Sequence, residues 1–232
     1  TLRAKILASN KHSTQDNSFM GVDLDSMKSK ITSKTRVIFI ANPGNPTGVA
    51  LPIKDIEVFI KKISKKIIVV IDEAYYEYSS YYGFKSGISL LGKYPNIIIT
   101  RSFSKIYALA GIRVGYGLAS KEIINKFNDI RQPFNVNYIA QRMAKESLSD
   151  DKYLKKSLDL NNIGMQFLKL EFDQLKISYL KSSTNFITFY LGNKTQQVYE
   201  MLLSEGVILR SLENYGLPSY LRVTVGTKDE NI

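Results

Sequence analysis

Lys105 stands in a short run of small and apolar residues, Ser-Phe-Ser-Lys, that directly follows an apolar stretch of the chain. A lysine amine in such surroundings can act as a nucleophile toward a carbonyl group. The alternative interpretation is a solvated loop lysine, which is the usual situation for an isolated lysine. Arg113 follows eight positions later, behind a glycine and an isoleucine.

The acidic cluster Asp72-Glu73-Ala74-Tyr75 ends a second apolar run. A carboxylate at the end of a buried run is costly unless it is paired, because burial removes it from water. We therefore expect Asp72 either to cap the N-terminus of a helix, a role that suits aspartate, or to meet a buried cation.

A third cluster, Asn-Pro-Gly-Asn-Pro-Thr-Gly at residues 42–48, follows a third apolar run. Its two prolines and its glycines predict a rigid, tightly folded loop. An ordinary turn explains this loop equally well when it is considered alone. Its place at the end of an apolar run favours a functional role.

The elements that must position these clusters are predicted from the apolar pattern. The Ile- and Val-rich runs at residues 36–41, 67–72 and 97–102 predict strands that are buried on both faces, as in a parallel sheet. Residues 52–64 have a helical pattern with a proline in the first turn. The alternation of strand and helix predicts an open α/β sheet, in which ligands bind beyond the carboxyl ends of the strands. The three clusters are therefore expected to form one site.

The second half of the chain is predicted to form a smaller α+β domain, residues 151–232, after a large domain at residues 1–150. A fourth strand at residues 113–119 precedes this boundary. Helices are predicted at residues 121–131, 137–148, 151–172 and 195–205, and further strands at 177–180, 186–191, 207–210 and 221–225.

Composition excludes several classes of protein. The chain has no Cys and only one histidine, His12, so disulfides, thiolate metal sites and histidine-cluster metal sites are not expected. No apolar run approaches the roughly 20 residues of a membrane span. The formal net charge is +11, but lysines are interleaved with acids along the chain, so we expect neither a nucleic-acid nor a membrane partner. A cytoplasmic location fits these features.

Together, the order and spacing of the clusters resemble the class I/II aminotransferase superfamily of fold-type I pyridoxal-phosphate enzymes. The strings IDEAYYEY, TRSFSKIYALAGIRVGYG and YLRVTVGTKDEN are most similar to the histidinol-phosphate aminotransferase family. The resemblance implies a large α/β domain with a mostly parallel sheet, and a smaller α+β C-terminal domain.

The resemblance also implies a role for each residue around the cofactor, pyridoxal 5'-phosphate. Lys105 would hold the cofactor as a Schiff base and then move a proton. Asp72 would pair with the ring nitrogen, and Asn45 and Tyr75 would hydrogen-bond the phenolic oxygen. Ala74 would leave room for the ring.

Anion-binding residues are implied in the same way. Ser102, Ser104 and Arg113 would bind the cofactor phosphate. Arg222 would bind the anionic group of the substrate, although a cross-strand ion pair is an alternative. Arg210 would assist it in recognising phosphate or a distal carboxylate, unless it is only a charge at the rim of a strand.

The activity implied is transamination between L-histidinol phosphate and 2-oxoglutarate in histidine biosynthesis, by a homodimer. Two alternatives keep the cofactor: an aromatic aminotransferase and an enzyme similar to threonine-phosphate decarboxylase. A third, of another class, is the aminotransferase-like sensor domain of a transcription regulator.

The ends of the chain suggest a piece of a longer polypeptide. Thr1 is not a start residue, and the last residues resemble a helix that is just beginning. Members of the resembled family have an N-terminal portion that supplies further cofactor-binding groups. We therefore expect the chain alone to bind the cofactor weakly.

Overall fold

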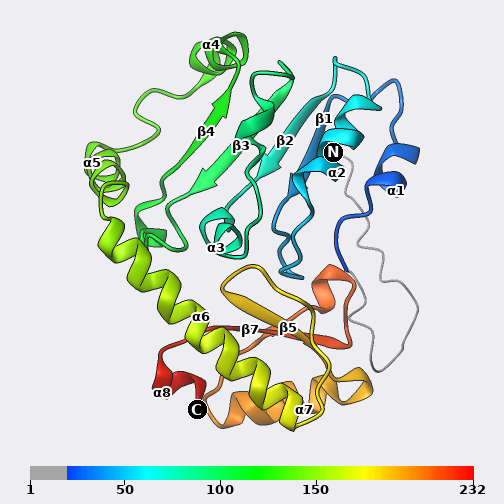
Figure 1. Cartoon of the computed structure of the whole chain (residues 1–232), viewed down its shortest axis with the longest axis vertical. Coiled ribbons are helices and arrows are strands. Elements are labelled where there is room, and N and C mark those ends of the chain that lie inside the picture. Colours follow the sequence, from blue (N-terminus) through cyan, green and yellow to red (C-terminus); the bar gives the residue numbers. More distant parts are fainter. Residues whose placement is uncertain (1–19) are drawn as a thin grey trace.

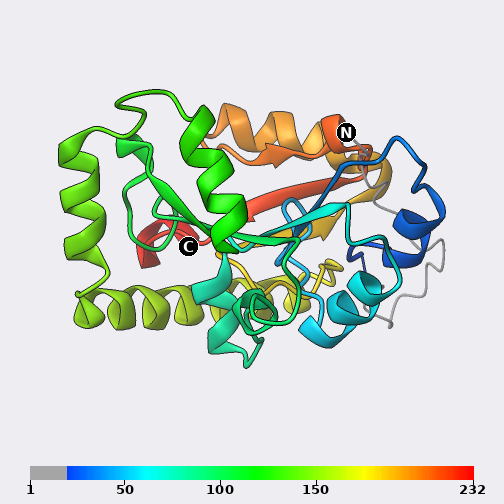
Figure 2. The ribbon, with the colours of Figure 1, turned by 90° about the horizontal axis from the view of Figure 1, so that it is seen from above.

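The computed structural model describes residues 20–232, so His12 lies outside the described part of the chain. Two sheets form the framework of this part, one at the top and one at the bottom of Figure 1. A long helix, α6 (Asp151–Gln174), runs from one to the other. In Figure 2, seen from above, α6 continues from α5 along one side of the molecule.

The first sheet has four strands in the order β1 (Val37–Ala41), β2 (Ile68–Asp72), β3 (Ile97–Ser102) and β4 (Gly115–Ala119). The first three are parallel, and β4 is antiparallel to β3. The four strands predicted in this half are confirmed, as is the mostly parallel α/β sheet. The fourth strand begins at Gly115, two residues later than predicted.

The core of this half lies on one face of the sheet, where two helices cover alternate strand residues. Helix α1 (Leu24–Ser29) and helix α2 (Ile53–Lys61) contribute apolar side chains. They pack on side chains two positions apart, which point to the same side of a strand. The buried cluster includes Met27, Ile56, Phe59 and Ile60 from the helices and Ile38, Ile40, Val69, Ile71, Ile97 and Ile99 from the strands.

Three helices follow β4, and each begins at a residue whose side chain accepts a hydrogen bond from a backbone N–H of the first turn. Ser120 caps α4 (Lys121–Ile130), Asn137 caps α5 (Tyr138–Ser147) and Asp150 caps α6. These residue types are preferred at helix N-termini because their oxygens satisfy otherwise unpaired donors. The helices predicted from residues 121, 137 and 151 are therefore confirmed.

The second sheet is antiparallel, in the order β5 (Phe186–Tyr190), β7 (Tyr220–Thr224) and β6 (Arg210–Ser211). Helix α6 packs on it through Met165 and Leu168, which contact Ile187 of β5. Helix α7 (Thr195–Ser204) confirms the helix predicted at residues 195–205, and a short helix, α8 (Lys228–Asn231), follows β7.

Two predicted strands were wrong for the same physical reason. Residues 177–180 form only an isolated bridge, between Tyr179 and Phe189, and of residues 207–210 only Arg210 lies in a strand. Each segment begins inside the C-terminal cap of a helix. The N–H of Ile177 donates to the carbonyl of Phe172 at the end of α6, and the N–H of Val207 donates to Leu202 at the end of α7. Such capping bonds follow a residue of positive φ, and they use donors that a strand would need.

A smaller apolar cluster joins the two sheets. Tyr75, Tyr78 and Ile106 come from the first half of the chain, and Phe186 comes from β5. The division of the chain into two domains at residue 150 stays a prediction. Within residues 20–232, no helix combines the length and apolar character needed to cross a membrane.

Candidate active site

The loop after β1, residues 42–48, is held by its first side chain. The buried amide of Asn42 donates to the carbonyl of Leu51 at 3.0 Å and accepts from the N–H of the same residue at 2.7 Å. The Asn42–Pro43 and Asn45–Pro46 peptide bonds are cis. Asn42 therefore shapes the loop, and the exposed side chain of Asn45 is the one presented to a ligand.

The second sheet and the segment that leads into it contact this loop at three points. The hydroxyl of Thr188 in β5 donates to the carbonyl of Pro46 at 2.5 Å, and the N–H of Ser183 donates to the carbonyl of Gly48 at 2.8 Å. Arg222 in β7 donates through Nη1 to Oδ1 of Asn45. The loop after β1 is therefore positioned by strands that follow it by more than 100 residues in the sequence.

Asp72 ends β2 beside the last residues of β3. Its Oδ1 accepts from the hydroxyl of Thr100 at 3.2 Å and from the N–H of Ala74 at 3.2 Å. Asp72 is exposed at the strand end, whereas the sequence argument expected a helix cap or a buried cation. Its partners are instead a hydroxyl and a turn N–H, because the strand ends at the surface. Both bonds use one oxygen, which leaves Oδ2 available for a ligand cation.

Tyr75 is the buried member of the second cluster. Its ring meets the ring of Phe186 edge to face, with 5.4 Å between centroids. Burial raises the pKa of the Tyr75 hydroxyl, the Arg222 guanidinium partly offsets this rise, and Asp72 adds to it. A tyrosine hydroxyl is protonated at neutral pH, and the raised pKa favours this form further, so Tyr75 can donate a hydrogen bond to an anionic oxygen.

Lys105 lies in the turn after β3, between two buried anchors. Phe103 and Ile106 are 3% and 2% exposed, which leaves Lys105 pointing away from the core. Its side chain is exposed, and Nζ lies 5.5 Å from the centroid of the Tyr75 ring. The amine is thus placed at the same edge of the sheet as Asp72, as the order of the strands predicts.

The residues proposed for an anion lie on either side of Lys105. The N–H of Ser104 donates to the hydroxyl oxygen of Ser102 at 3.0 Å, and Ser102 pairs with Gly115 across β3 and β4. Arg113 lies two residues before Gly115 and has φ +58°. Its Nη1 donates to the carbonyl of Ala110 at 2.7 Å. The guanidinium is therefore held against its own loop, with its other nitrogens exposed to a ligand.

Arg222 points from β7 toward the first sheet. Its guanidinium carbon lies 4.7 Å from the centroid of the Phe186 ring. Its Nε is buried and has no hydrogen-bond partner among the described residues, an arrangement that is costly unless a ligand supplies an acceptor. Arg210, which is exposed, is its cross-strand partner in β6.

Sequence reasoning did not select three residues of this site. Thr100 could have been found, because it stands two positions before Ser102 in the same predicted strand and therefore faces the same side. Phe186 and Tyr215 gave no such signal. Phe186 packs on Tyr75, and Tyr215 lies near enough that its ionised form would add to the rise in the pKa of Tyr75.

This set of groups fits a phosphorylated pyridine aldehyde. An amine is available for the aldehyde, a carboxylate for the ring nitrogen, and a protonated phenol and an amide for a ring oxygen. Hydroxyls and a guanidinium are available for a phosphate. The unpartnered Nε of Arg222 adds a place for a second anion.

This fold and this site define the class of protein. Residues 10–232 match the family described as Aminotransferase class I and II, and the chain belongs to that family.

Within this family, the chain is similar to individual relatives that are named as histidinol-phosphate aminotransferases. Over 230 residues it is 41% identical to a histidinol-phosphate aminotransferase 1 of Nitrosococcus oceani, with 99% of this chain and 62% of the relative covered. It is 44% identical over 211 residues to a histidinol-phosphate aminotransferase 2 of Pseudomonas fluorescens, with 91% and 57% covered.

A solved structure shows the same fold. The histidinol-phosphate aminotransferase of Sinorhizobium meliloti, in complex with pyridoxal-5'-phosphate, superposes with a TM-score of 0.82 at 26% identity, covering 91% of this chain and 59% of that one. The chain thus spans about three fifths of the length of the relatives it matches.

Proposed function

We propose that this chain supplies the lysine and most of the cofactor site of a pyridoxal-phosphate-dependent aminotransferase. The observation that supports this most directly is the position of the Lys105 amine beside the Tyr75 ring. Around it, Asp72 acts on the pKa of Tyr75, and Arg222 hydrogen-bonds Asn45. These residues come from the ends of separate strands, and the proposed chemistry needs all of them at one place.

Each residue has a distinct role toward the cofactor. Lys105 would bind the aldehyde carbon, and Asp72 would hold the ring nitrogen in its protonated form. Asn45 and Tyr75 would donate hydrogen bonds to the phenolic oxygen, with Ala74 leaving space for the ring. The phosphate would be bound by Ser102, Ser104 and Arg113.

The chain's own groups would carry the proton transfer. When bound, pyridoxal phosphate supplies an electron-withdrawing ring that stabilises negative charge at the substrate Cα. The Lys105 Nζ would accept the proton from the substrate Cα and act as the general base. Arg222 would orient the substrate by binding its anionic group, so that the Cα–H bond faces Lys105.

We propose L-histidinol phosphate and 2-oxoglutarate as the substrates. The names of the relatives support this choice. So do the paired arginines of β6 and β7, because guanidinium groups bind phosphate and carboxylate alike. The amino donor would present its phosphate, and the keto acid its carboxylates, to the same pair.

We propose further that the full-length protein is a cytoplasmic homodimer. The end of α4, the loop that follows it and the start of α5 expose large apolar side chains, with Ile130 77%, Phe134 97% and Tyr138 74% exposed. An exposed apolar surface of this kind is typical of an interface with protein. Sedimentation of an active full-length protein as a monomer would contradict this part of the proposal.

The test uses the full-length protein that contains this chain. Purified with pyridoxal phosphate, it should convert L-histidinol phosphate and 2-oxoglutarate to imidazole-acetol phosphate and glutamate. Lys105→Ala should abolish the reaction and the borohydride-reducible cofactor adduct, while Lys61→Ala, at an exposed lysine of α2, should change neither. Turnover of aromatic amino acids instead, or phosphothreonine decarboxylation, would replace the proposed substrate. Cofactor binding without any turnover would favour the sensor class.

A further inference from the structure

A buried arginine lies behind the proposed cofactor site, at the position before Ser102 in β3. The side chain of Arg101 is 7% exposed and points to the face of the strand opposite that of Thr100 and Ser102. Its Nε and Nη2 lie 2.8 Å and 2.7 Å from Oε2 of Glu73. One guanidinium thereby joins the ends of β2 and β3 on the side away from the ligand.

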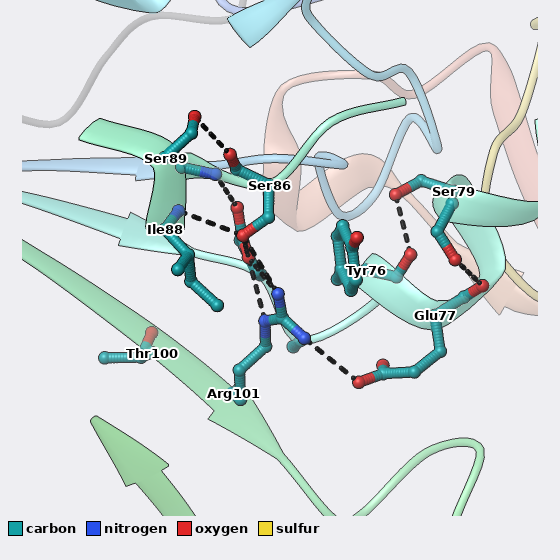
Figure 3. A network of polar contacts seen from close by, with 12 residues as sticks. Tyr76, Glu77, Ser79, Ser86, Ile88, Ser89, Thr100 and Arg101 are labelled. Carbon is teal, nitrogen blue, oxygen red and sulfur yellow. Dashed lines mark hydrogen bonds and ion pairs between the residues drawn. The ribbon is translucent and has the colours of Figure 1, made fainter. Parts of the chain in front are cut away.

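The same guanidinium also contacts helix α3 (Tyr76–Tyr81) and the short 3-10 helix η1 (Gly87–Leu90). Its Nη1 lies 3.3 Å from Oε1 of Glu77, and its carbon lies 3.8 Å from the centroid of the Tyr76 ring. Nη2 donates to the hydroxyl of Ser86 at 3.0 Å. Figure 3 shows Arg101 between these groups, with the Tyr76 ring beside it.

Glu73 is held from both sides, which completes the network. Its Oε1 accepts from the N–H of Gly87 at 2.6 Å, and its Oε2 accepts from the hydroxyl of Ser86 at 2.8 Å as well as from Arg101. The carboxylate is 2% exposed, so every one of these bonds is made away from water. A buried carboxylate bound in this way has one position and cannot itself reach a ligand.

The contacts of Arg101 enclose the segment that is proposed to bind the cofactor ring. Arg101 binds Glu73, which directly follows Asp72, and it contacts Tyr76, which directly follows Tyr75. Both ends of the segment Asp72–Tyr75 are therefore held through the side chain of Arg101. Arg101 itself directly precedes Ser102. Movement of the guanidinium would therefore shift the groups proposed for the ring nitrogen, the phenolic oxygen and the phosphate together.

Only arginine can make this set of contacts. Its planar fork presents several N–H donors in fixed directions and stacks on an aromatic face, whereas a lysine is a single flexible charge. A lysine at position 101 could neutralise one carboxylate. It could not bind Glu73 twice while also contacting Glu77, Ser86 and Tyr76.

We propose that Arg101 is a positioning residue, which sets the geometry of the cofactor site by fixing Asp72, Tyr75 and Ser102 from behind. This inference rests on the proposed function, because it assigns the role of Arg101 relative to that cofactor. The residue touches neither cofactor nor substrate in this arrangement. Its effect is transmitted through the backbone of the residues it adjoins.

The test is Arg101→Lys in the full-length protein, with Arg36→Lys as the matched control. Arg36 is an exposed arginine whose Nη1 donates to the carbonyls of Ser33 and Thr35 at 2.6 Å and 3.2 Å, so the same substitution there removes only surface contacts. We expect Arg101→Lys to weaken pyridoxal-phosphate binding by on the order of 10-fold, the usual effect of losing a group that orients a ligand-binding residue. The visible circular dichroism of the bound cofactor should also change, because the ring then sits differently. The control should change neither.

A second, milder variant keeps the test decisive if Arg101→Lys does not fold. Ser86→Ala removes one hydroxyl that contacts both Arg101 and Glu73, and leaves both charges in place. It should alter the cofactor's circular dichroism in the same direction, while the cofactor-free protein stays folded with a lower melting temperature. If either folded variant were less stable but bound the cofactor with wild-type affinity and wild-type dichroism, Arg101 would be only structural and the inference would be overturned.

The outcomes also separate this inference from the function on which it rests. A wild-type full-length protein that does not bind pyridoxal phosphate overturns both. A wild-type protein that binds the cofactor but does not transaminate histidinol phosphate contradicts the proposed reaction alone, and the binding and dichroism measurements still decide the role of Arg101.

Discussion

Arg210 and Arg222 lie directly opposite each other on the antiparallel strands β6 and β7. Two like charges at directly opposite positions destabilise a sheet. Arg222 also buries an Nε that has no partner among residues 20–232. An anion bound between the two side chains would remove both costs, which supports the proposal that this pair binds a ligand.

The first prediction concerns this pair. Arg222→Gln in the full-length protein should lower kcat/KM by about 100-fold, because a charge-assisted contact made in a partly buried site is lost. The loss should be similar for the amino donor and the keto acid if both bind there. Arg36→Gln, at an exposed arginine before β1, serves as the control. Steady-state kinetics in which only one substrate were affected would show that the two anions bind separately.

The second prediction concerns Thr188, whose hydroxyl donates to the Pro46 carbonyl in a fully buried position. Thr188→Val keeps the shape but leaves that carbonyl unpaired, which costs about 1–3 kcal/mol. It should also weaken cofactor binding several-fold, since Asn45 adjoins Pro46. Thr188→Ser retains the hydroxyl and should behave like the wild type. Urea denaturation and cofactor titration measure the two effects, and equal behaviour of the valine and serine variants would contradict the role of this bond.

A third prediction compares two glycines that both have positive φ. A Cβ on Gly48, at φ +78°, would lie 2.3 Å from the hydroxyl oxygen of Ser182, whereas a Cβ on Gly83, at φ +82°, would meet nothing within 4 Å. Gly83→Ala should therefore lower the free energy of unfolding only by the cost of placing a side chain at positive φ, about 1–2 kcal/mol. Gly48→Ala should cost an additional 1–3 kcal/mol or so from overpacking. Equal free energies of unfolding for the two variants would show that the loop and the second sheet are not in contact at Gly48.

The sequence predicts those parts of the fold that depend on local pattern. The buried strands of the first sheet and the helices that follow it could be predicted because each has its own signal, a run of apolar residues or apolar residues at helical spacing. The two segments wrongly predicted as strands each begin within the C-terminal cap of a helix. The first N–H group of each segment donates to a carbonyl of that helix and is not available to a strand. Lys176 adopts positive φ at the end of α6 without being a glycine, so the end of that helix had no residue to mark it.

The same distinction applies to the candidate site, where local motifs can be recognised in the sequence and contacts between distant residues cannot. The residues proposed around the cofactor lie in short motifs, so they could be selected from the sequence, and the order of the strands predicts that they meet. The contacts that position them could not be found in this manner. Thr188 and Pro46 are 142 positions apart, and Asn45 and Arg222 are 177 positions apart, and no periodicity links such pairs. Arg101 follows an apolar run and has no pattern that distinguishes a buried arginine from an exposed one.

The last prediction separates the two carboxylates that share Arg101. Glu73 accepts hydrogen bonds on both oxygens and forms the closer ion pair, so Glu73→Gln should destabilise the protein by about 3–5 kcal/mol.

Glu77 has one contact with Arg101, at 3.3 Å, and burial raises the pKa of its carboxyl, with Arg101 only partly offsetting the rise. A raised pKa in the folded state means that the contribution of Glu77 to stability is complete below the unfolded value of 4.5 and is lost as the pH rises through the folded value. Glu77→Gln should therefore be neutral or stabilising at pH 7, and its advantage over the wild type should shrink as the pH falls toward 4.5. Urea denaturation of both variants at two pH values provides the measurement. Destabilisation of Glu77→Gln at pH 7 equal to that of Glu73→Gln would show that Arg101 binds the two carboxylates with equal strength.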